Sequence, residues 1–406
     1  MTAPGGPRAA TPYDARFAVT VLTAMNLLNY MDRYVPSAVK DLIKRDLHLT
    51  DAQTSWPLTA FVVVYMLTSP IFGSLSDRVP RKHLIAAGVV LWSLATGAAS
   101  LATGFWSLLA ARALVGVGEA AYATLAPPLL SDLYPPERRN RILTYFYVAI
   151  PVGAALGFTL GGILGARFGW RAAFLAVGLP GVLAALAALR IHDPGRAPGE
   201  STESVKWPEA LRLLLRNRSY VYAVAGYAAV TFAAGGMADW LPAYLSRVHG
   251  ASLERAGSLV GTVTILGGLG GTLIGGLLAD RMTKLTKNPY LALSSLSMIP
   301  ATVFAALAFI VNGLYSSIAC VGLAQFFLWF YNGPINTEIA NSTTPALRAR
   351  AFALSILCIH LFGDAVSPPI IGALSDYTGS ITLAVSVVPL TMALGGLLWG
   401  IGWRRT

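Results

Sequence analysis

The chain of 406 residues is 55% hydrophobic and only 12% charged, and its formal net charge is +11. Soluble proteins carry about 25% charged residues, so this composition excludes a water-soluble fold. Because one crossing of a bilayer takes about 20 apolar residues, a chain of this length and composition is predicted to be an all-α, polytopic membrane protein.

The apolar runs fall into two groups of six. The first group is predicted at residues 17–38, 53–75, 83–101, 105–128, 141–165 and 171–189. The second group is predicted at residues 220–244, 255–279, 289–311, 314–338, 347–371 and 381–402. The first run is too long for a cleaved signal peptide and is interpreted as a retained helix. We therefore expect 12 transmembrane helices in two six-helix bundles, residues 1–190 and 219–406, joined by a linker at 191–218 with an amphipathic segment at 207–215.

The basic residues are unevenly distributed between the two sets of loops. The two termini and the loops on their side hold 21 Lys and Arg residues, whereas the opposite loops hold 7. By the positive-inside rule, we expect both termini and the linker in the cytoplasm and the protein in a cell inner membrane. The positive charge then faces anionic membrane lipids, and nucleic acid is not an expected partner.

Four charged residues interrupt otherwise apolar runs: Asp32 and Arg33 in the first run, and Arg112 and Glu119 in the fourth. The two pairs reach similar depths, because their helices cross a core of about 30 Å in opposite directions. Charges at such depth usually face a cavity and carry function, and a carboxylate whose basic partner moves can load and release a proton. We expect Asp32 and Glu119 to bind protons, with Arg33 and Arg112 as counter-charges. A static structural ion pair is the alternative.

The loop after the second run reads GSLSDRVPRK from Gly73 to Lys82. This pattern resembles the signature loop of the major facilitator superfamily, in which the loop acts as a latch that favours one facing state. Asp77 can accept hydrogen bonds from a neighbouring helix N-terminus, and Arg78 and Arg81 can pair with carboxylates or anionic lipid. The resemblance implies a cytoplasmic gate at these three residues. A basic loop without a gating role is the alternative.

The fifth run combines glycine and proline. Gly153, Gly157 and Gly161 are spaced four apart, which forms a small-residue stripe typical of close helix packing. Pro151 removes a backbone hydrogen bond, so this helix is expected to pack tightly and to bend. Its pattern loosely resembles the antiporter motif of the same superfamily, with Ile150-Pro151 in place of the usual Gly-Pro pair.

The second half carries polar residues among aromatic ones. In the tenth run an aromatic cluster lies beside amide side chains, a mixture suited to an apolar tail and a polar head. In the eleventh run a histidine and an aspartate lie four apart on one helix face. The alternatives are core or lipid-facing positions for the aromatic residues and a satisfied polar pair for the other two. The candidate cavity residues are Gln325, Phe330, Asn332, Asn336, His360 and Asp364.

Three correspondences indicate two homologous halves. The segment GSLSDR returns as GLLADR 203 residues later. The spacing P-x-x-R-x-R that starts at Pro136 returns at Pro345, 209 residues later. Asp32 and Asp239 lie 207 residues apart, late in their runs. Nearly constant offsets of this kind are expected of the internal repeats of transporters.

Four segments are similar, in order and spacing, to Spinster transporters: NYMDRY from Asn29, GSLSDRVPRK from Gly73, RALVGVGEAAYATLAP from Arg112 and YFYVAIPVGAALG from Tyr145. The resemblance covers the first half of the chain. It implies a major facilitator fold and a proton-coupled secondary transporter of lysophospholipid or sphingolipid-like molecules. It also places Asp32 and Arg33 on the family's first-helix acid and base, and Arg112 and Glu119 on its fourth-helix pair.

Two other functions remain open at this stage. A facilitator of small polar solutes or drugs would share the fold, and a membrane-embedded enzyme would need a nucleophile with a base, or metal ligands. The sequence contains no HExxH, GxSxG or P-loop pattern, and Cys320 and Cys358 fit no disulfide or metal spacing. We expect no catalytic residue, cofactor or metal. The expected partners are an amphipathic lipid with its head near Arg112 and Glu119, protons and membrane lipids, and the protein is expected to be a monomer.

Overall fold

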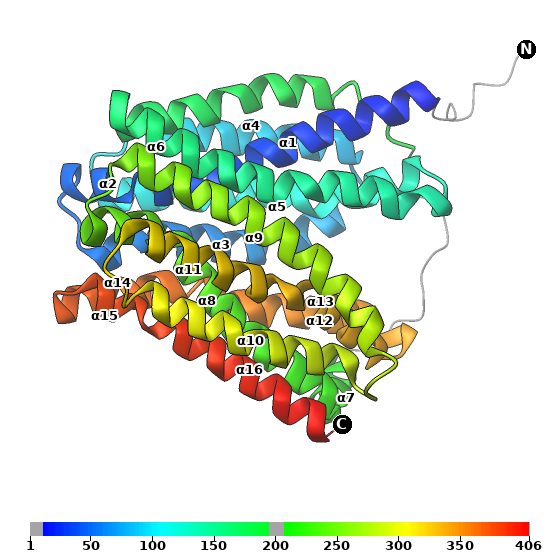
Figure 1. Ribbon diagram of the computed structural model, residues 1–406. Helices are drawn as coiled ribbons and strands as arrows, with labels where there is room; N and C mark the ends of the chain where they lie inside the picture. The colour runs from blue at the N-terminus through cyan, green and yellow to red at the C-terminus, as the bar shows by residue number, and fades with distance from the viewer. Residues whose placement is uncertain (1–10, 195–206, 406) are drawn as a thin grey trace, which may run out of the picture.

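The computed structural model describes residues 11–194 and 207–405, which are nearly all helical and contain no strand (Figure 1). The helices of the first half are α1 (Pro12–Ala38), α2 (Lys40–Asp46), α3 (Asp51–Leu75), α4 (Arg81–Ala99), α5 (Phe105–Leu133) and α6 (Pro136–Ala188). The second half begins with α7 (Trp207–Arg216), α8 (Arg218–His249), α9 (Leu253–Met282), α10 (Pro289–Ala308) and α11 (Leu314–Leu328). It continues through η1 (Trp329–Tyr331), α12 (Asn332–Asn341), α13 (Pro345–Ile359), η2 (His360–Asp364), α14 (Ser367–Thr378), α15 (Ile381–Val385) and α16 (Val387–Arg405).

These helices make the predicted 12 crossings. Ten helical segments of the described residues are long and apolar enough to span a membrane. One of them, α6, has 53 residues and turns back at Gly169, so it crosses twice. Gly169 has a φ of 82°, a conformation that residues with a Cβ rarely adopt. The remaining crossing is α1, whose apolar character is diluted by Asp32 and Arg33.

Two crossings of the second half are interrupted near their middle. The predicted run 314–338 is built from α11 and α12 with the 3₁₀ turn η1 between them. The predicted run 347–371 is built from α13 and α14 with the π-helical turn η2 between them, in which Gly363 leaves the helical conformation. Such interruptions free backbone groups and are frequent at functional sites.

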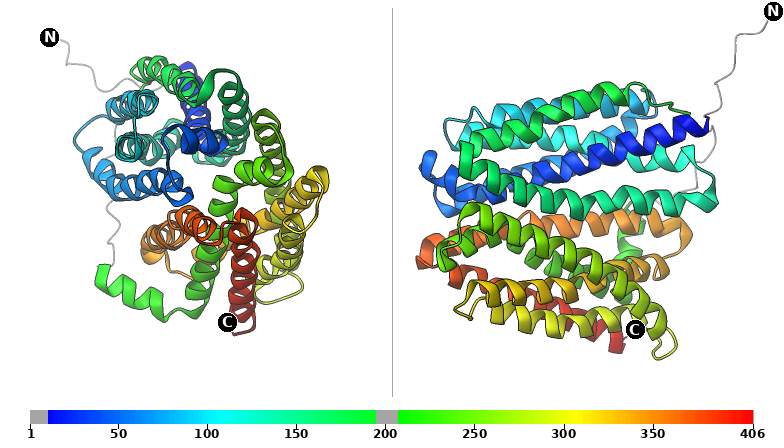
Figure 2. Two further views of the ribbon diagram at one scale, coloured as in Figure 1. Left: turned by 90° about the vertical axis from the view of Figure 1, so that its left-hand side faces the viewer. Right: turned by 45° about the horizontal axis from the view of Figure 1, so that its top comes forward.

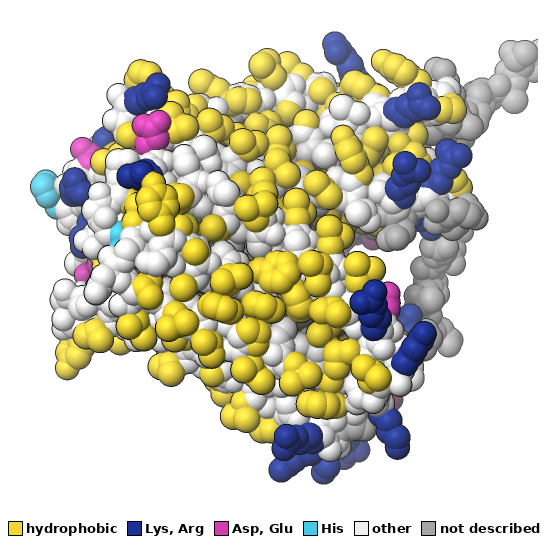
Figure 3. Space-filling model, viewed as in Figure 1, with side chains coloured by type: hydrophobic (Ala, Val, Ile, Leu, Met, Phe, Trp, Pro, Cys, Tyr) yellow, Lys and Arg dark blue, Asp and Glu magenta, His cyan; other side chains and the backbone are white. Residues whose placement is uncertain are grey.

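The two halves lie side by side, and their two ends differ. Figure 1 places the first half above the second, and Figure 2 shows two groups of helices in the view along them. At the end where α1 and α8 finish, hydrogen bonds and ion pairs join the halves. At the end where α1 begins and α16 finishes, the surface is hollowed between the halves (Figure 3). We call these the closed end and the open end.

Glycine allows α6 to pack closely on two neighbours. A Cβ on Gly153 or Gly157 would lie 2.6 or 2.7 Å from a carbonyl oxygen of α1, so only glycine fits this approach. The predicted stripe is thus the contact between α6 and α1. A second contact joins the halves, because a Cβ on Gly257 of α9 would lie 2.3 Å from the carbonyl oxygen of Phe158 in α6.

The internal repeat is visible in equivalent loop structures. Arg139 Nε donates to the carbonyl oxygen of Tyr134 at 3.1 Å, just before α6. Arg348, 209 residues later, also donates to a carbonyl oxygen of the preceding helix end, that of Ala340 at 3.2 Å, although this acceptor lies eight residues back and not five. Both arginines satisfy a carbonyl near the C-terminus of the preceding helix. The repeated P-x-x-R spacing is therefore a repeated cap.

The predicted linker is described in part. Its residues 195–206 lie outside the described residues. Its amphipathic segment forms α7, in which Ala210 and Leu214 are buried against the second half. Trp207, Leu211 and Leu215 are exposed on α7 at a spacing of four residues. An apolar stripe of this kind suits a helix at a membrane surface.

Candidate functional site

Asp32 of α1 and Arg112 of α5 form a buried ion pair in the first half. Arg112 Nη1 lies 3.1 Å from Asp32 Oδ1, and the Thr96 hydroxyl of α4 donates to Asp32 Oδ2 at 2.7 Å. Both charged side chains are at most 2% exposed. Each charge is stabilised mainly by the other, because both are shielded from water. Arg112 Nη2 has no hydrogen-bond partner among the described residues.

Arg33 and Glu119 form a second ion pair beside the first. Arg33 Nε donates to Glu119 Oε2 at 2.7 Å, and Glu119 Oε1 has no partner among the described residues. The guanidinium of Arg33 lies 4.8–5.2 Å from the ring centroids of Tyr30, Phe61 and Tyr65. Arg33 is 19% exposed, whereas Glu119 is completely buried. Arg33 is therefore the member of this pair that a ligand can reach.

The helix register explains why these four residues meet. Glu119 follows Arg112 by two turns of α5, so both lie on one helix face. Asp32 and Arg33 are consecutive in α1, and each faces one member of the α5 pair. The structure thus brings together all four residues that the sequence analysis expects at similar depth.

A cavity of about 160 Å³ lies next to Arg33. Most of its lining comes from α1, α5 and the first part of α6, and the lining residues of α1 precede Arg33, toward the open end. Asn29 lines it, is 1% exposed, and has an amide nitrogen without a partner among the described residues. The described lining contains no acidic residue; its polar residues are Asn26, Asn29, Tyr30, Arg33, Tyr65, Tyr122 and Tyr147. Asn26 and Tyr122 already donate to backbone carbonyls, whereas Asn29 Nδ2 and Arg33 can still donate to an anionic group.

His360 and Asp364 are in contact in the second half. His360 Nδ1 lies 2.9 and 3.1 Å from the two carboxylate oxygens of Asp364, and the two side chains are 24% and 28% exposed. The pair occupies η2, where the helix widens. A Cβ on Gly235 of α8 would lie 2.5 Å from the Cβ of Asp364, which shows how closely α8 approaches.

The candidate residues of the tenth crossing occupy different environments. Phe330 is 5% exposed and packs with Phe326 and Phe327 in the core between α9 and α10, which corresponds to the core alternative. Gln325 is 7% exposed and its Oε1 has no partner among the described residues. Asn332 and Asn336 are half-buried, and Asn336 Nδ2 donates to the carbonyl oxygen of Asn332 at 2.7 Å. The structure therefore groups none of these with the ion pairs of the first half.

Of the three residues of the predicted gate, Asp77 and Arg78 lie between α3 and α4 at the open end, and Arg81 is the first residue of α4. Asp77 and Arg78 are exposed, whereas Arg81 is 2% exposed. Arg81 Nη1 lies 2.6 Å from Asp132 Oδ2, and its Nη2 lies 3.0 Å from Asp193 Oδ1. Asp132 lies near the end of α5 and Asp193 follows α6 at the start of the linker, so Arg81 joins these segments to the start of α4.

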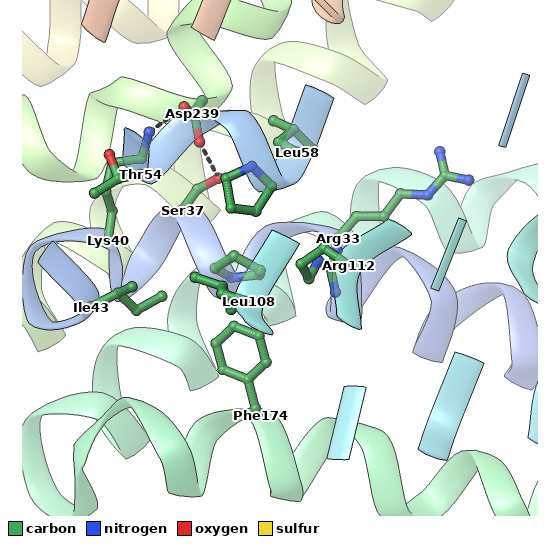
Figure 4. A pocket seen from close by; sticks show the side chains of 12 residues that line it. Arg33, Ser37, Lys40, Ile43, Thr54, Leu58, Leu108, Arg112, Phe174 and Asp239 are labelled. Atoms are coloured by element: carbon green, nitrogen blue, oxygen red, sulfur yellow. Dashed lines mark hydrogen bonds and ion pairs between the residues drawn. The ribbon is translucent and has the colours of Figure 1, made fainter. Parts of the chain in front are cut away.

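The closed end contains a charged cluster that the sequence analysis does not single out. Lys40 pairs with Asp239 of the second half, and Ser37 donates to the same carboxylate at 3.0 Å (Figure 4). A cavity of about 20 Å³, large enough for one water molecule, separates this cluster from Arg33 and Arg112. Asp239, which the repeat relates to Asp32, thus lies in the interface between the halves.

The chain matches known transporters over nearly its whole length. The sequence profile of the Major Facilitator Superfamily matches residues 22–368. The probable sphingolipid transporter spinster homolog 2 of Arabidopsis thaliana is 30% identical, over 94% of this chain and 85% of that protein. Protein spinster homolog 1 of Homo sapiens is 33% identical, over 90% of this chain and 74% of that protein.

A solved structure has the same fold. The crystal structure of a bacterial homolog of the human lysosomal transporter Spinster, in an inward-facing and unoccupied conformation, superimposes with a TM-score of 0.82. The match covers 97% of this chain and 96% of that one at 23% sequence identity. At this identity the similarity concerns the fold.

Proposed function

The chain belongs to the Spinster transporters of the major facilitator superfamily, and we propose that it couples the movement of an amphipathic, single-chain lipid to the movement of protons. As a member of this family it is a multi-pass membrane transporter and not an enzyme. The proposal concerns the cargo and the coupling ion. It also retains the expected topology, with both termini in the cytoplasm of a cell with an inner membrane.

The observation that carries the proposal is the pair of adjacent ion pairs beside the cavity. Among the described residues, Glu119 has one hydrogen-bond partner, Arg33, and Arg33 is also the cation that reaches the cavity. An anionic head group would compete with Glu119 for Arg33. A proton on Glu119 would remove that competition, so proton binding and head-group binding strengthen each other.

The second ion pair supports the same coupling. In the described part of the chain, Asp32 has Thr96 and Arg112 as its hydrogen-bond partners, and both are buried with it. Each carboxylate would need a proton if its arginine moved away during a conformational change. We therefore propose Asp32 and Glu119 as the proton-binding residues, with Arg33 and Arg112 as counter-charges. The head group is placed at Arg33 rather than Arg112, because Arg112 is fully buried.

The cargo class rests on the cavity and on the family. The probable sphingolipid transporter among the relatives carries its substrate class in its name. In this chain, donors of the first half suit an anionic head, and the half-exposed residues of the second half, including Asn336, His360 and Asp364, would lie along the tail or the rest of the head. A chain of about 16 methylenes contributes about 0.8 kcal/mol per methylene, so the tail supplies most of the affinity and the head decides selectivity.

We expect competition binding with a labelled lysophospholipid to separate these two contributions. Shortening the acyl chain should weaken binding steadily for the parent protein and for Arg33→Ala alike, since the tail contacts remain. Only Arg33→Ala should lose the preference for lipids with an anionic group. Arg255→Ala, at an exposed arginine of α9, is the matched control. Indifference to both chain length and head group would instead favour the alternative of small polar solutes or drugs.

The loop with Asp77, Arg78 and Arg81 is proposed as the gate at the open end. In the present conformation the halves are separated there, and Arg81 bonds within the first half. We expect Asp77→Asn to favour this conformation, because the loop would lose a negative charge that a helix N-terminus of the second half can attract. Cysteine accessibility in the hollow should therefore increase for Asp77→Asn and stay at the parent level for Lys82→Gln. Equal accessibility in both variants would leave the loop without a gating role.

A further inference from the structure

The closed end is held by a buried ion pair between the halves. Lys40 lies at the start of α2 and Asp239 lies in α8, and each residue is 3% exposed. Ser55 of α3 contacts both, at 2.7 Å from Lys40 Nζ and 2.8 Å from Asp239 Oδ2. The ring of Trp240 lies 3.8 Å from Lys40 Nζ. The pair is thus buried among several partners, and the one-water cavity toward Arg33 and Arg112 is next to it.

A second ion pair crosses the interface in the opposite direction. Arg247 of α8 reaches Asp41 of α2, at 2.5 Å from its Nη2, and Asp51 of α3, at 2.7 Å from its Nη1. Arg247 follows Lys40 by 207 residues, the same interval that separates Asp32 from Asp239. The two halves therefore exchange equivalent cations: Lys40 of the first half binds the second, and Arg247 of the second half binds the first.

Hydrogen bonds from α14 complete this end. The backbone amides of Asp51 and Ala52 donate to the carboxylate of Asp376, each at 2.9 Å. The hydroxyl of Ser375 donates to Asp51 at 2.7 Å. These contacts would all break if the two halves separated at the closed end. The two ion pairs differ in their access to water. The side chain of Arg247 is 24% exposed, whereas that of Lys40 is 2% exposed.

We infer that Lys40 and Asp239 are the gate pair that sets the population of conformations open at the closed end. Two opposite charges in a buried interface attract each other strongly, but water recovers nearly the same free energy by hydrating both charges when the interface opens. Such a pair stabilises the closed conformation of this end and still allows the end to open. Two well-packed apolar side chains at the same place would gain no hydration energy when the interface opens. They would therefore keep this end closed. The inference requires a transporter with two facing states, and it does not depend on protons or lipid as cargo.

Three kinds of variant at Lys40 and Asp239 are expected to have different effects. Lys40→Met leaves Asp239 buried without its cation, so the closed conformation loses stability and the open one gains population by about tenfold or more. The charge swap K40D with D239K restores the attraction and should return the population to the parent level. The apolar pair K40M with D239L should keep the end shut and reduce transport by about tenfold or more, with ligand binding from the open end retained.

The fraction of molecules that are open at the closed end can be measured with two spin labels placed there. Leu101 of the first half and Tyr377 of the second are 77% and 90% exposed, so cysteine at these positions is accessible for labelling. The two native cysteines, Cys320 and Cys358, are replaced by alanine in this background. Double electron–electron resonance in proteoliposomes then reports the fraction of molecules with a long distance between the labels.

A matched control lies at the same end. Asp46 pairs with Arg171 within the first half, and hydrogen bonds from Arg171 and Trp170 hold the pKa of Asp46 below its ordinary value. Asp46→Asn breaks an ion pair that does not cross the interface, so the distance distribution should not change. The inference is overturned if Lys40→Met leaves the distribution unchanged, or if the folded charge-swap variant does not return it toward the parent. If Lys40→Met does not fold, the apolar pair decides: transport at the parent rate contradicts the inference.

Discussion

Glu119→Gln is expected to abolish substrate accumulation driven by a pH gradient while leaving substrate exchange across the membrane intact. Glutamine keeps the size of the side chain and an acceptor for Arg33, but it cannot take up a proton. The variant therefore resembles the protonated state permanently, in which Arg33 is available to the head group. Binding should persist, whereas energy stored in the proton gradient no longer reaches the substrate.

This result can be measured in proteoliposomes with an imposed pH gradient and a labelled lysophospholipid. Asp32→Asn is expected to lose gradient-driven accumulation as well, because asparagine still accepts the Thr96 hydrogen bond but does not titrate. Glu209→Gln removes an exposed carboxylate of α7, away from both ion pairs, and should keep the parent response. Parent-like accumulation by both Glu119→Gln and Asp32→Asn would falsify their assignment as proton-binding residues.

Arg112→Met is expected to lower the thermal stability of the protein in detergent by several degrees or to prevent its folding. Removing one partner of a buried ion pair leaves a charge without compensation, which costs about 3–5 kcal/mol. Asp32 would be that charge, with the Thr96 hydroxyl as its remaining partner. The double variant D32N with R112M has no such charge and should recover most of the stability.

The double variant also distinguishes a working ion pair from a static one. If Asp32 and Arg112 only hold α1 and α5 together, the stabilised double variant should transport with normal pH dependence. If Asp32 takes part in coupling, the double variant should be stable yet unresponsive to the pH gradient. Thermal unfolding and gradient-driven uptake, measured on the same preparation, separate these outcomes.

The sequence is sufficient to predict the fold and the central charged residues. Twelve apolar runs and a repeat of about half the chain length determine the architecture. Asp32, Arg33, Arg112 and Glu119 are conspicuous because charge is costly in hydrocarbon. Their partners depend on the rotation of α1 against α5, which hydropathy does not encode, so the pairing of Arg33 with Glu119 needs the structure.

The closed-end gate lies beyond what the apolar pattern can predict. Lys40 follows the first run and Arg247 follows the seventh, where a basic residue is ordinary, so neither is unusual by composition. Their burial depends on contacts between halves that are separated by about 200 residues in sequence. The available signal was the repeat, since Lys40 and Arg247 are as far apart as Asp32 and Asp239.

The same limit applies to the loop after α3 and to the tenth crossing. Arg81 was expected in a cytoplasmic gate, and in this conformation it bonds to Asp132 near the end of α5 and to Asp193, which follows α6. Phe330, an aromatic residue expected to line a cavity, lies in the hydrophobic core between α9 and α10. Which face of an apolar helix meets a cavity is decided by packing, and residues of similar polarity occur on both faces.

The central claim is that lipid and protons move together, and substrate-induced proton movement in the parent protein tests it most directly. Proteoliposomes with a pH-sensitive dye inside are given a lysophospholipid without an imposed gradient, beside protein-free liposomes and liposomes with Glu119→Gln. The account predicts a change of internal pH that accompanies lipid uptake only with the parent protein. Lipid uptake by the parent protein without any change of internal pH would contradict it.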